Sequence, residues 1–277
     1  MPVRLIAIDI DGTLLDTRWA VPPANADAIA RAVARGVEVV LATGRRFDFA
    51  RPVLDRLPPV QLIVVSGGAL TKRRDGATVA RHALPRPTAK RVLEATVEFR
   101  PHMAVVFDRE GPNQMIYERI DWEDPRHRGY FERNRGALGE VAPLEACLTE
   151  DPIQVMAAGS VATMRALAAA LAAVPDGGFE VALTEYETRD LSILDVTAAG
   201  VSKGSALAEL ARERGLAPEA VMAIGDNLND LPMLEVAGVR VVMGNASAEL
   251  KALGWAETGT NDEAGVAQAI ERFALGG

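Results

Sequence analysis

The chain has 277 residues, a formal net charge of −8 at pH 7 and a hydrophobic fraction of 49%. That length fits one very large domain or two ordinary ones, and the composition excludes a disordered, collagen-like or coiled-coil chain. No apolar stretch is long enough to span a bilayer, and an acidic chain without a basic block is not typical of nucleic-acid binding. The single cysteine, Cys147, cannot form a disulfide within the chain, which is typical of a reducing compartment. We therefore expect a cytoplasmic protein that binds neither nucleic acid nor membranes.

Short, continuous apolar runs alternate with a helical pattern in the first third of the chain. The runs cover residues 5–8, 37–42 and 61–65, and such runs are typical of strands that are covered on both faces. Between the first two runs, Pro22-Pro23 opens a helical pattern that Gly36 closes. This order predicts a β-α-β unit.

The middle of the chain has a different pattern, in which strands and helices do not alternate regularly. We predict strands at 103–107 and 114–117, followed by a polar stretch. After it we predict a strand at 153–157, an alanine-rich helix at 164–174 and two more strands at 179–183 and 191–196. Hairpin-like strands with interposed helices indicate an α+β domain inserted into an α/β domain.

The last third of the chain returns to the alternating pattern. It predicts a helix at about 205–214, a strand at 221–224, a helix near 231–236 and a strand at 239–243. Both ends of the chain are therefore expected to share one parallel sheet. The predicted fold class is α/β, with a Rossmann-like parallel-sheet core of residues 1–83 and 198–277 and an inserted α+β domain of residues 84–197.

The first predicted strand runs into Asp9-Ile10-Asp11-Gly12-Thr13. Residues two apart on an extended chain face the same way, so Asp9 and Asp11 are expected to project together from the carboxyl edge of the sheet. Two carboxylates ~4 Å apart repel by about 4 kcal/mol at an effective dielectric of about 20, which calls for a cation such as Mg²⁺ between them. One aspartate can then attack phosphorus, and the other can protonate the leaving oxygen and activate water. The alternative is a solvated Asp-Gly turn.

Two further segments indicate a site for an anion. In Thr43-Gly44-Arg45, a hydroxyl, backbone N–H groups and a guanidinium follow the second predicted strand, although such a tripeptide alone is usually only a helix entry. Lys203 lies at the predicted start of a helix, where the dipole disfavours a cation. A phosphate would account for Lys203, and a solvated side chain is the alternative.

The segment after the strand at 221–224 again carries carboxylates. Asp226 is placed to complete a metal shell, Asn229 to donate to phosphate or substrate, and Asp230 to hold Lys203 or the loop. Helix capping by Asn227 or Asn229 is the alternative for one of these polar residues, but not for all of them.

In this order and spacing, the four segments resemble the four motifs of the haloacid dehalogenase superfamily of phosphatases. The inserted segment and Met243-Gly244-Asn245-Ala246 resemble its Cof-like sugar-phosphatase branch, which has a type IIB cap. The chain departs from that pattern at Ser66-Gly67-Gly68-Ala69, where the family usually has Asn-Gly-Ala, and at Ala264-Gly265-Val266, where it usually has Asp-Gly-Val. Neither departure touches the nucleophile, acid/base or metal positions.

The resemblance implies a role for each motif residue. Asp9 would be the nucleophile and Asp11 the general acid/base, with Thr13 supporting the loop. Mg²⁺ would be held by the Asp9 carboxylate, the Asp11 backbone carbonyl and Asp226. The phosphate would be bound by Thr43, Lys203 and Asn229, with Gly44 and Arg45 beside them, and Asp230 would be a supporting residue. The insertion would be a mobile cap that closes over the substrate and sets its specificity.

Other polar side chains carry less specific signals. An arginine-rich cluster in the insertion is either a solvated face or a site for an acidic substrate group; it comprises Arg126, Arg128, Arg133 and Arg135 with Tyr130 and Phe131. The three histidines, His82, His102 and His127, are too scattered for a zinc site.

These observations predict a phosphoric monoester hydrolase that uses Mg²⁺ and an aspartyl-phosphate to hydrolyse the phosphate monoester of a small metabolite, such as a sugar phosphate. Three alternatives remain open. One is phosphoryl transfer to a second sugar hydroxyl, as in phosphomutases. The others are a regulator that binds sugar phosphates without catalysis and a phospho-switch resembling a receiver domain. The expected partner is a small phosphorylated metabolite, and the expected state is a monomer or a homodimer.

Overall fold

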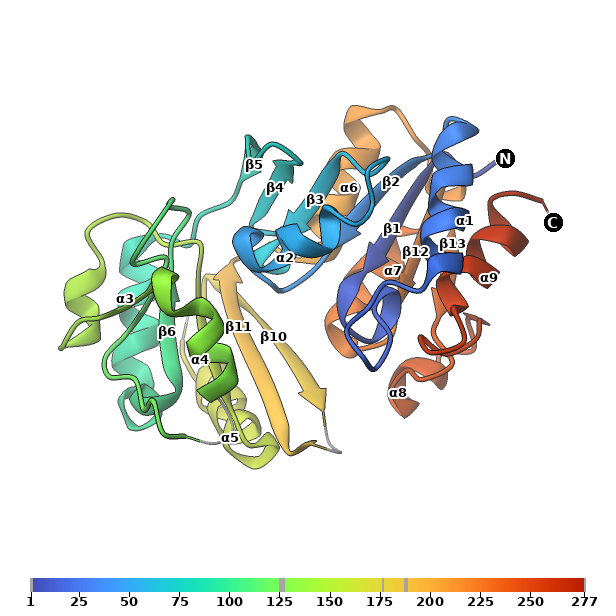
Figure 1. Cartoon of the computed structure of the whole chain (residues 1–277). Helices are drawn as coiled ribbons and strands as arrows, with labels where there is room; N and C mark the ends of the chain where they lie inside the picture. The colour runs from blue at the N-terminus through green and yellow to red at the C-terminus, as the bar shows by residue number, and fades with distance from the viewer. Residues whose placement is uncertain (1, 125–127, 176, 187–188, 277) are drawn as a thin grey trace. The chain divides into compact units, whose positions relative to one another are not determined.

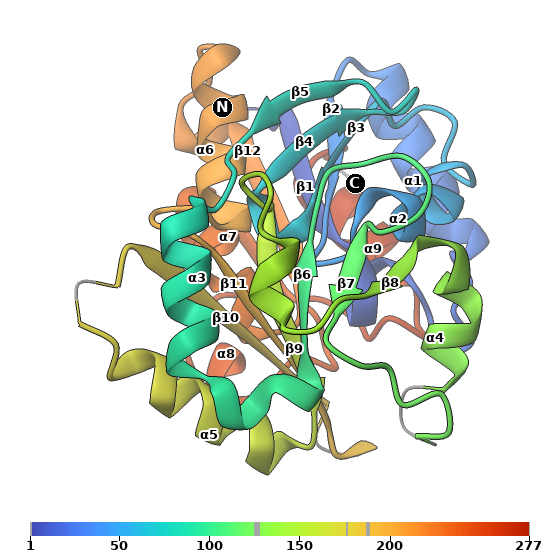
Figure 2. The same ribbon diagram turned by 90° about the vertical axis from the view of Figure 1, so that its left-hand side faces the viewer.

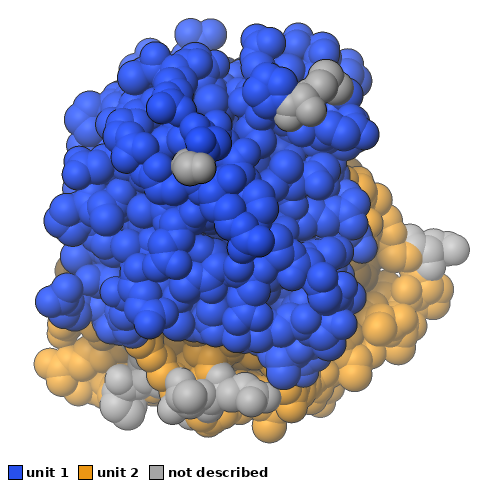
Figure 3. Space-filling model, turned by 90° about the vertical axis from the view of Figure 1, so that its right-hand side faces the viewer, with its two compact units in different colours: residues 1–81, 202–277 blue, residues 82–201 orange. Residues whose placement is uncertain are grey.

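A computed structural model describes residues 2–124, 128–175, 177–186 and 189–276. The chain divides into two compact units, coloured separately in Figure 3. Unit 1 contains Met1–Arg81 and Ser202–Gly277, and unit 2 contains His82–Val201. Among the described residues, no helix combines the length and the apolar character needed to cross a membrane.

Unit 1 is built on an eight-stranded sheet with the order β14-β13-β12-β1-β2-β3-β4-β5. Figure 1 labels its strands from β13 to β5. The six strands from β14 to β3 pair in parallel, whereas β4 and β5 add an antiparallel edge. The strands are β1 (Leu5–Asp9), β2 (Glu38–Ala42), β3 (Leu62–Val65), β4 (Leu70–Arg73), β5 (Thr78–Arg81), β12 (Val221–Gly225), β13 (Val239–Val242) and β14 (Ala256–Glu257). The sequence analysis predicted the central strands but not β4, β5 or the two-residue β14.

The core of unit 1 lies between this sheet and its helices. All residues of β1 and β12 are buried, which fits their continuous apolar runs; Asp9, at the end of β1, is the charged exception. Side chains of α6 and α7 pack against these strands on one face, and α1 packs against α9. The helices are α1 (Pro23–Ala34), α2 (Phe47–Leu54), α6 (Lys203–Glu213), α7 (Leu231–Val236), α8 (Ala248–Lys251) and α9 (Gly265–Phe273).

Unit 2 has a six-stranded sheet with the order β10-β11-β9-β6-β7-β8, in which only the β7–β8 pair is parallel. Helices α3 and α5 lie on one face of it (Figure 2). They enclose an apolar core that includes Cys147. The elements are α3 (Arg86–Ala95), β6 (Met103–Val106), β7 (Met115–Tyr117), α4 (Arg128–Asn134), β8 (Leu138–Glu140), β9 (Gln154–Gly159), α5 (Val161–Ala172), β10 (Phe179–Tyr186) and β11 (Leu191–Ala198). The predicted α/β fold class with an additional α+β part is thereby confirmed.

The predicted segments of unit 2 differ from the structure in two ways. Helices α3 and α4 were not predicted, because Pro87 inside the first turn of α3 and the polar sequence of α4 conceal their helical periodicity. The three-residue strand β8 was not predicted either. Helix α5 begins at Val161, three residues before the predicted start. The side chain of Ser160 caps it by accepting a hydrogen bond from the Thr163 amide at 3.1 Å.

Candidate active site

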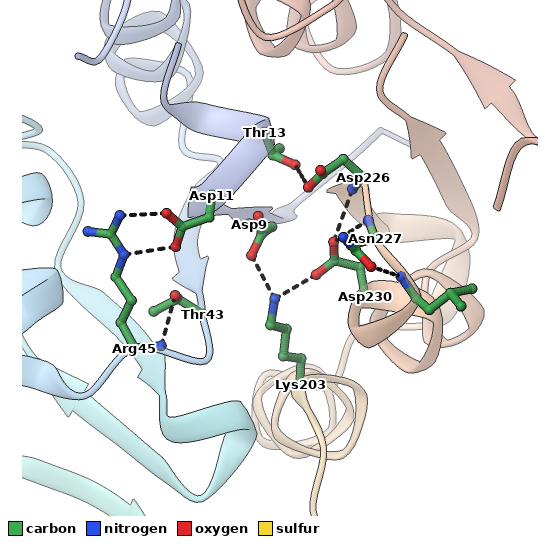
Figure 4. A network of polar contacts seen from close by, with 10 residues as sticks. Asp9, Asp11, Thr13, Thr43, Arg45, Lys203, Asp226, Asn227 and Asp230 are labelled. Atoms are coloured by element: carbon green, nitrogen blue, oxygen red, sulfur yellow. Dashed lines mark hydrogen bonds and ion pairs between the residues drawn. The ribbon is translucent and has the colours of Figure 1, made fainter. Parts of the chain in front are cut away.

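A buried lysine lies at the centre of the site, where α6 begins. The Ser202 side chain caps the helix, so that Lys203 is its first residue, two residues before the predicted start. The Lys203 side chain is only 2% exposed, and its Nζ lies 2.6 Å from Asp9 Oδ1 and 2.6 Å from Asp230 Oδ1 (Figure 4). Burial by itself lowers the pKa of Lys203, but the carboxylates of Asp230 and Asp9 outweigh burial and raise that pKa above its usual value.

Asp230 connects this lysine to the loop that follows β12. Its second oxygen, Oδ2, accepts hydrogen bonds from the backbone N–H groups of Asp226 at 3.0 Å and Asn227 at 3.1 Å. The sequence predicted that Asp230 holds either Lys203 or the loop. In the structure Asp230 contacts both. Asn227 Oδ1 accepts from the Leu228 amide at 2.9 Å, which is the capping contact considered as an alternative. Asn229 is half-buried on the same turn.

Asp226 packs directly against the loop that follows β1. Thr13 Oγ1 donates to Asp226 Oδ1 at 3.0 Å. Gly12 has a φ of +84°, and a Cβ atom at this position would lie 2.3 Å from Asp226 Oδ2. Only glycine fits there, because both its backbone conformation and the space beside it exclude a side chain. The Gly12-Thr13 pair therefore orients the Asp226 carboxylate.

The Asp11 side chain is turned toward Arg45, away from Asp9 (Figure 4). Strand β1 ends at Asp9, and a short helical turn over Ile10–Leu14 follows. Residues two apart face the same way only on an extended chain, so the expectation that Asp9 and Asp11 project together is wrong. Arg45 donates to both oxygens of Asp11, from Nε at 2.8 Å and from Nη2 at 2.5 Å. The guanidinium also lies over the rings of Phe49 at 4.7 Å and Trp19 at 5.6 Å.

The ends of β2 and β3 complete the sheet edge. Thr43 is buried, and its Oγ1 accepts a hydrogen bond from the Arg45 backbone N–H at 3.1 Å, across Gly44. In the segment Ser66-Gly67-Gly68-Ala69, a Cβ atom at Gly68 would lie 2.1 Å from the Ser202 carbonyl oxygen. The sequence analysis missed this role of Gly68, which lets the β3 loop approach the start of α6.

The charges and donors of the site fit a divalent cation. Carboxylate oxygens of Asp9, Asp226 and Asp230 lie within 4.8 Å of one another, and Lys203 is the cation that contacts this cluster among the described residues. Burial, followed by the charge of Asp230, raises the pKa of Asp9 to about 7. Burial and the charge of Asp9 raise the pKa of Asp226 well above its usual value. These shifts reflect a deficit of positive charge.

Two carboxylate oxygens remain available for such a cation. Asp9 Oδ1 and Asp226 Oδ1 accept hydrogen bonds from Lys203 and Thr13. Within the described part of the chain, Oδ2 of Asp9 and Oδ2 of Asp226 accept no hydrogen bond. Asp230 has both oxygens occupied by donors, which fits a supporting role better than that of a ligand. Hard oxygen donors of this kind suit Mg²⁺.

The fold and the site define an α/β protein with a buried Asp-Lys-Asp cluster at the carboxyl edge of its parallel sheet. A family model described as haloacid dehalogenase-like hydrolase matches residues 6–270. The chain therefore belongs to the haloacid dehalogenase-like hydrolases, and the predictions of this family and of an enzyme of the hydrolase class are confirmed.

Three relatives illustrate the similarity. The chain is 29% identical to the phosphatase YwpJ of Bacillus subtilis, over 98% of this chain and 100% of that protein. It is also 29% identical to the pyridoxal phosphate phosphatase YbhA of Escherichia coli, over 98% of each protein. A solved structure of a sugar phosphatase of haloacid dehalogenase subclass IIB matches with a TM-score of 0.80 and 22% identity, over 99% of this chain and 100% of that one, which shows the fold.

The arginine-rich cluster of the insertion is only partly within the described residues, because Arg126 lies outside them, as does His127. Arg128 pairs with Glu132 at 3.0 Å, and the guanidinium of Arg135 lies 4.1 Å from the centre of the Trp122 ring. These contacts lie within unit 2 and are those of a surface face, so a contact with substrate stays a prediction.

Proposed function

We propose that the protein is a Mg²⁺-dependent phosphatase, which hydrolyses the phosphate monoester of a small metabolite through an aspartyl-phosphate on Asp9. The observation that carries the proposal is the buried contact of Lys203 with Asp9 and Asp230, beside the Asp226 carboxylate. Burying ion pairs to this extent costs desolvation energy. Clusters of this kind are concentrated at functional sites.

The proposed reaction assigns each proton and bond to a residue. A carboxylate oxygen of Asp9 attacks phosphorus, and the bond from phosphorus to the ester oxygen breaks. Asp11, in its protonated form, donates its proton to the leaving oxygen and, as a carboxylate, then takes a proton from the water that hydrolyses the aspartyl-phosphate. Because the structure has Asp11 paired with Arg45, this role requires its side chain to leave that contact.

The charges around Asp9 explain how two anions can meet there. Mg²⁺, held by Asp9, the Asp11 carbonyl and Asp226, would offset the repulsion between the carboxylate and the phosphate. Lys203 supplies a second positive charge beside the nucleophile, and the Thr43 hydroxyl and Asn229 amide, with Gly44 and Arg45 nearby, supply donors for the phosphate oxygens.

The relatives support a small phosphorylated metabolite as the substrate. The E. coli relative is named for pyridoxal phosphate, and another relative, from B. subtilis, is named for 5-amino-6-(5-phospho-D-ribitylamino)uracil. We assign the choice among such substrates to the inserted residues 84–197, as the resemblance to type IIB caps implies. The proposal includes action in the cytoplasm as a monomer or a homodimer.

The test measures phosphate release from a panel of sugar phosphates, nucleotides and cofactor phosphates, with Mg²⁺ and with EDTA. We expect Asp9→Asn to lower the rate on the best substrate at least about 10³-fold, since an amide oxygen is a poor nucleophile. Asp75→Asn, in the exposed turn between β4 and β5, is the matched control and should keep full activity. Full activity of Asp9→Asn with Mg²⁺ would contradict the mechanism. An isomerised sugar phosphate in place of free phosphate would indicate a mutase.

A further inference from the structure

A short segment after β13 connects the two loops that carry the proposed metal ligands. We call residues 243–247 the brace segment. The Met243 and Ser247 backbone N–H groups donate to the carbonyl oxygens of Gly225 and Asp226, each at 3.0 Å. From the same segment, Asn245 Nδ2 donates to the carbonyl oxygen of Gly12 at 2.8 Å. The brace segment therefore bonds to the loop after β12 through its backbone and to the loop after β1 through one side chain.

A second asparagine fixes the amide of Asn245. The backbone N–H of Asn261 donates to Asn245 Oδ1 at 2.9 Å, which leaves Nδ2 directed at Gly12. The side chain of Asn261 is buried and donates to the carbonyl oxygen of Leu15 at 2.8 Å. Residues from the C-terminal part of the chain thus hold the β1 loop at two carbonyl groups on either side of Thr13.

The position of the Gly12 carbonyl matters for the proposed metal site. Its peptide group joins Gly12, against which Asp226 Oδ2 packs, to Thr13, which holds Asp226 Oδ1. The peptide before it carries the Asp11 carbonyl, the proposed backbone ligand. A shift of this loop would therefore separate the backbone ligand from the Asp226 carboxylate.

We propose that Asn245 is a positioning residue, which sets the spacing between the Asp11 carbonyl and Asp226 and thereby the affinity for the divalent cation. This inference rests on the proposed function. Residues that orient metal ligands typically contribute about 10- to 100-fold to metal affinity. Asn245 itself is exposed, so its truncation leaves no buried cavity and returns the Gly12 carbonyl to water.

The test uses the full chain and Mn²⁺ as the probe, because Mn²⁺ takes the same oxygen ligands as Mg²⁺ and its binding can be followed by electron paramagnetic resonance. We expect Asn245→Ala to weaken Mn²⁺ binding at least about 10-fold, with the unfolding midpoint of the metal-free protein close to that of the wild type. Asn245→Asp, which keeps the acceptor for Asn261 but loses the donor to Gly12, should weaken binding as well.

The matched control is Thr258→Val, which removes a hydrogen bond of 2.7 Å to the Gly265 carbonyl oxygen in the same C-terminal region, a bond in which neither metal-bearing loop takes part. We expect its Mn²⁺ affinity to equal that of the wild type. Wild-type affinity in Asn245→Ala would overturn the role of Asn245 and leave the phosphatase proposal intact. Failure of the wild-type chain itself to bind Mn²⁺ would overturn both.

Discussion

At the scale of single residues, the site is defined by an imbalance of charge. Three buried carboxylates lie together, and Lys203 contacts two of them, Asp9 and Asp230. Each carboxylate with a raised pKa owes the shift first to burial and then to a neighbouring carboxylate. Such a cluster is stable only while the lysine stays in place, because removing one partner leaves buried charges without compensation. Lys203 is therefore expected to matter for folding as well as for catalysis.

Replacement of Lys203 tests that dual role. We expect Lys203→Met to lower the free energy of unfolding by about 3–5 kcal/mol at neutral pH and to abolish phosphate release. In the wild type, burial raises the pKa of Asp9 to about 7 although Lys203 lowers it, so removal of Lys203 raises this pKa further, and protonation then relieves the unpaired charge as the pH falls. The loss of stability should therefore be largest above pH 7 and smaller below it. Urea unfolding between pH 6 and 8.5 would check this trend, and a pH-independent loss would contradict it.

At the scale of elements, a close approach between α6 and α7 sets the position of Lys203. A Cβ atom at Gly204 would lie 2.3 Å from the carbonyl oxygen of Pro232 in α7. Gly204 directly follows Lys203, so the contact that brings the two helices together also places the lysine under the sheet edge.

Gly204→Ala should separate these helices. We expect a loss of about 2–3 kcal/mol in the free energy of unfolding, typical of overpacking, and a lower phosphate-release rate because Lys203 moves with α6. Gly136→Ala is the matched control, since among the described residues no heavy atom outside its own turn and chain neighbours lies within 4 Å of the position that its methyl group would take, and its φ is not positive. Urea unfolding of both variants would check the prediction, and equal stability would show that α6 can shift without cost.

In unit 2, a buried arginine makes stability sensitive to acid. Arg100 is buried, donates to the Leu93 carbonyl oxygen at 2.9 Å and contacts Glu145 through Nη1 at 3.0 Å. The hydrogen bond from Arg100 is the main reason why the pKa of Glu145 lies below its usual value. A carboxyl with a lowered folded-state pKa stabilises the fold above its unfolded-state pKa, and this contribution is lost as the pH falls through the folded-state value.

We therefore expect Glu145→Gln to lower the free energy of unfolding by roughly 1.5–3 kcal/mol at pH 7, and the difference from wild type to shrink below about pH 4. Glu150→Gln removes the half-exposed partner of Arg109 and should cost at most about 1 kcal/mol. Denaturant unfolding at pH 7, 4 and 3 would separate the two variants. An equal cost at every pH would mean that the Glu145 charge contributes nothing.

At the scale of the whole molecule, every proposed metal ligand belongs to unit 1, although the ligands come from both ends of the chain. Asp9 and Asp11 lie near the N-terminus, and Asp226 lies after the insertion. The two units have separate cores, so metal binding should stabilise one of them selectively.

Hydrogen exchange measured with Mg²⁺ and with EDTA would test this selectivity. We expect Mg²⁺ to slow exchange in the loops 10–15 and 226–230, and to leave peptides of the unit 2 core unchanged. A ligand at about 100 times its Kd stabilises the folded state by ~2.7 kcal/mol, which is large enough to detect. Equal protection of both units would contradict a metal site confined to unit 1.

The class of fold, and most of the residues that the structure brings together in the buried cluster, could be predicted from the order of amino acids alone. Continuous apolar runs identified β1, β2, β3, β12 and β13 because strands covered on both faces contain few polar residues. Asp9, Asp226 and Asp230 follow strands of this sheet, so their neighbourhood followed from the rule that parallel strands end at one edge. Lys203 begins α6 and follows no strand of this sheet, so that rule does not place it. The short edge strands β4, β5 and β14 contain too few residues to show a recognisable hydrophobic pattern.

Which polar groups contact one another depends on how the chain packs in three dimensions. The turn after β1 directs Asp11 to Arg45, and nothing in the local sequence of either residue encodes that partner. Likewise, Asn245 and Asn261 reach the β1 loop from more than 200 positions away. Apolar periodicity reports burial along one element, whereas contacts between distant loops depend on the packing of the whole sheet.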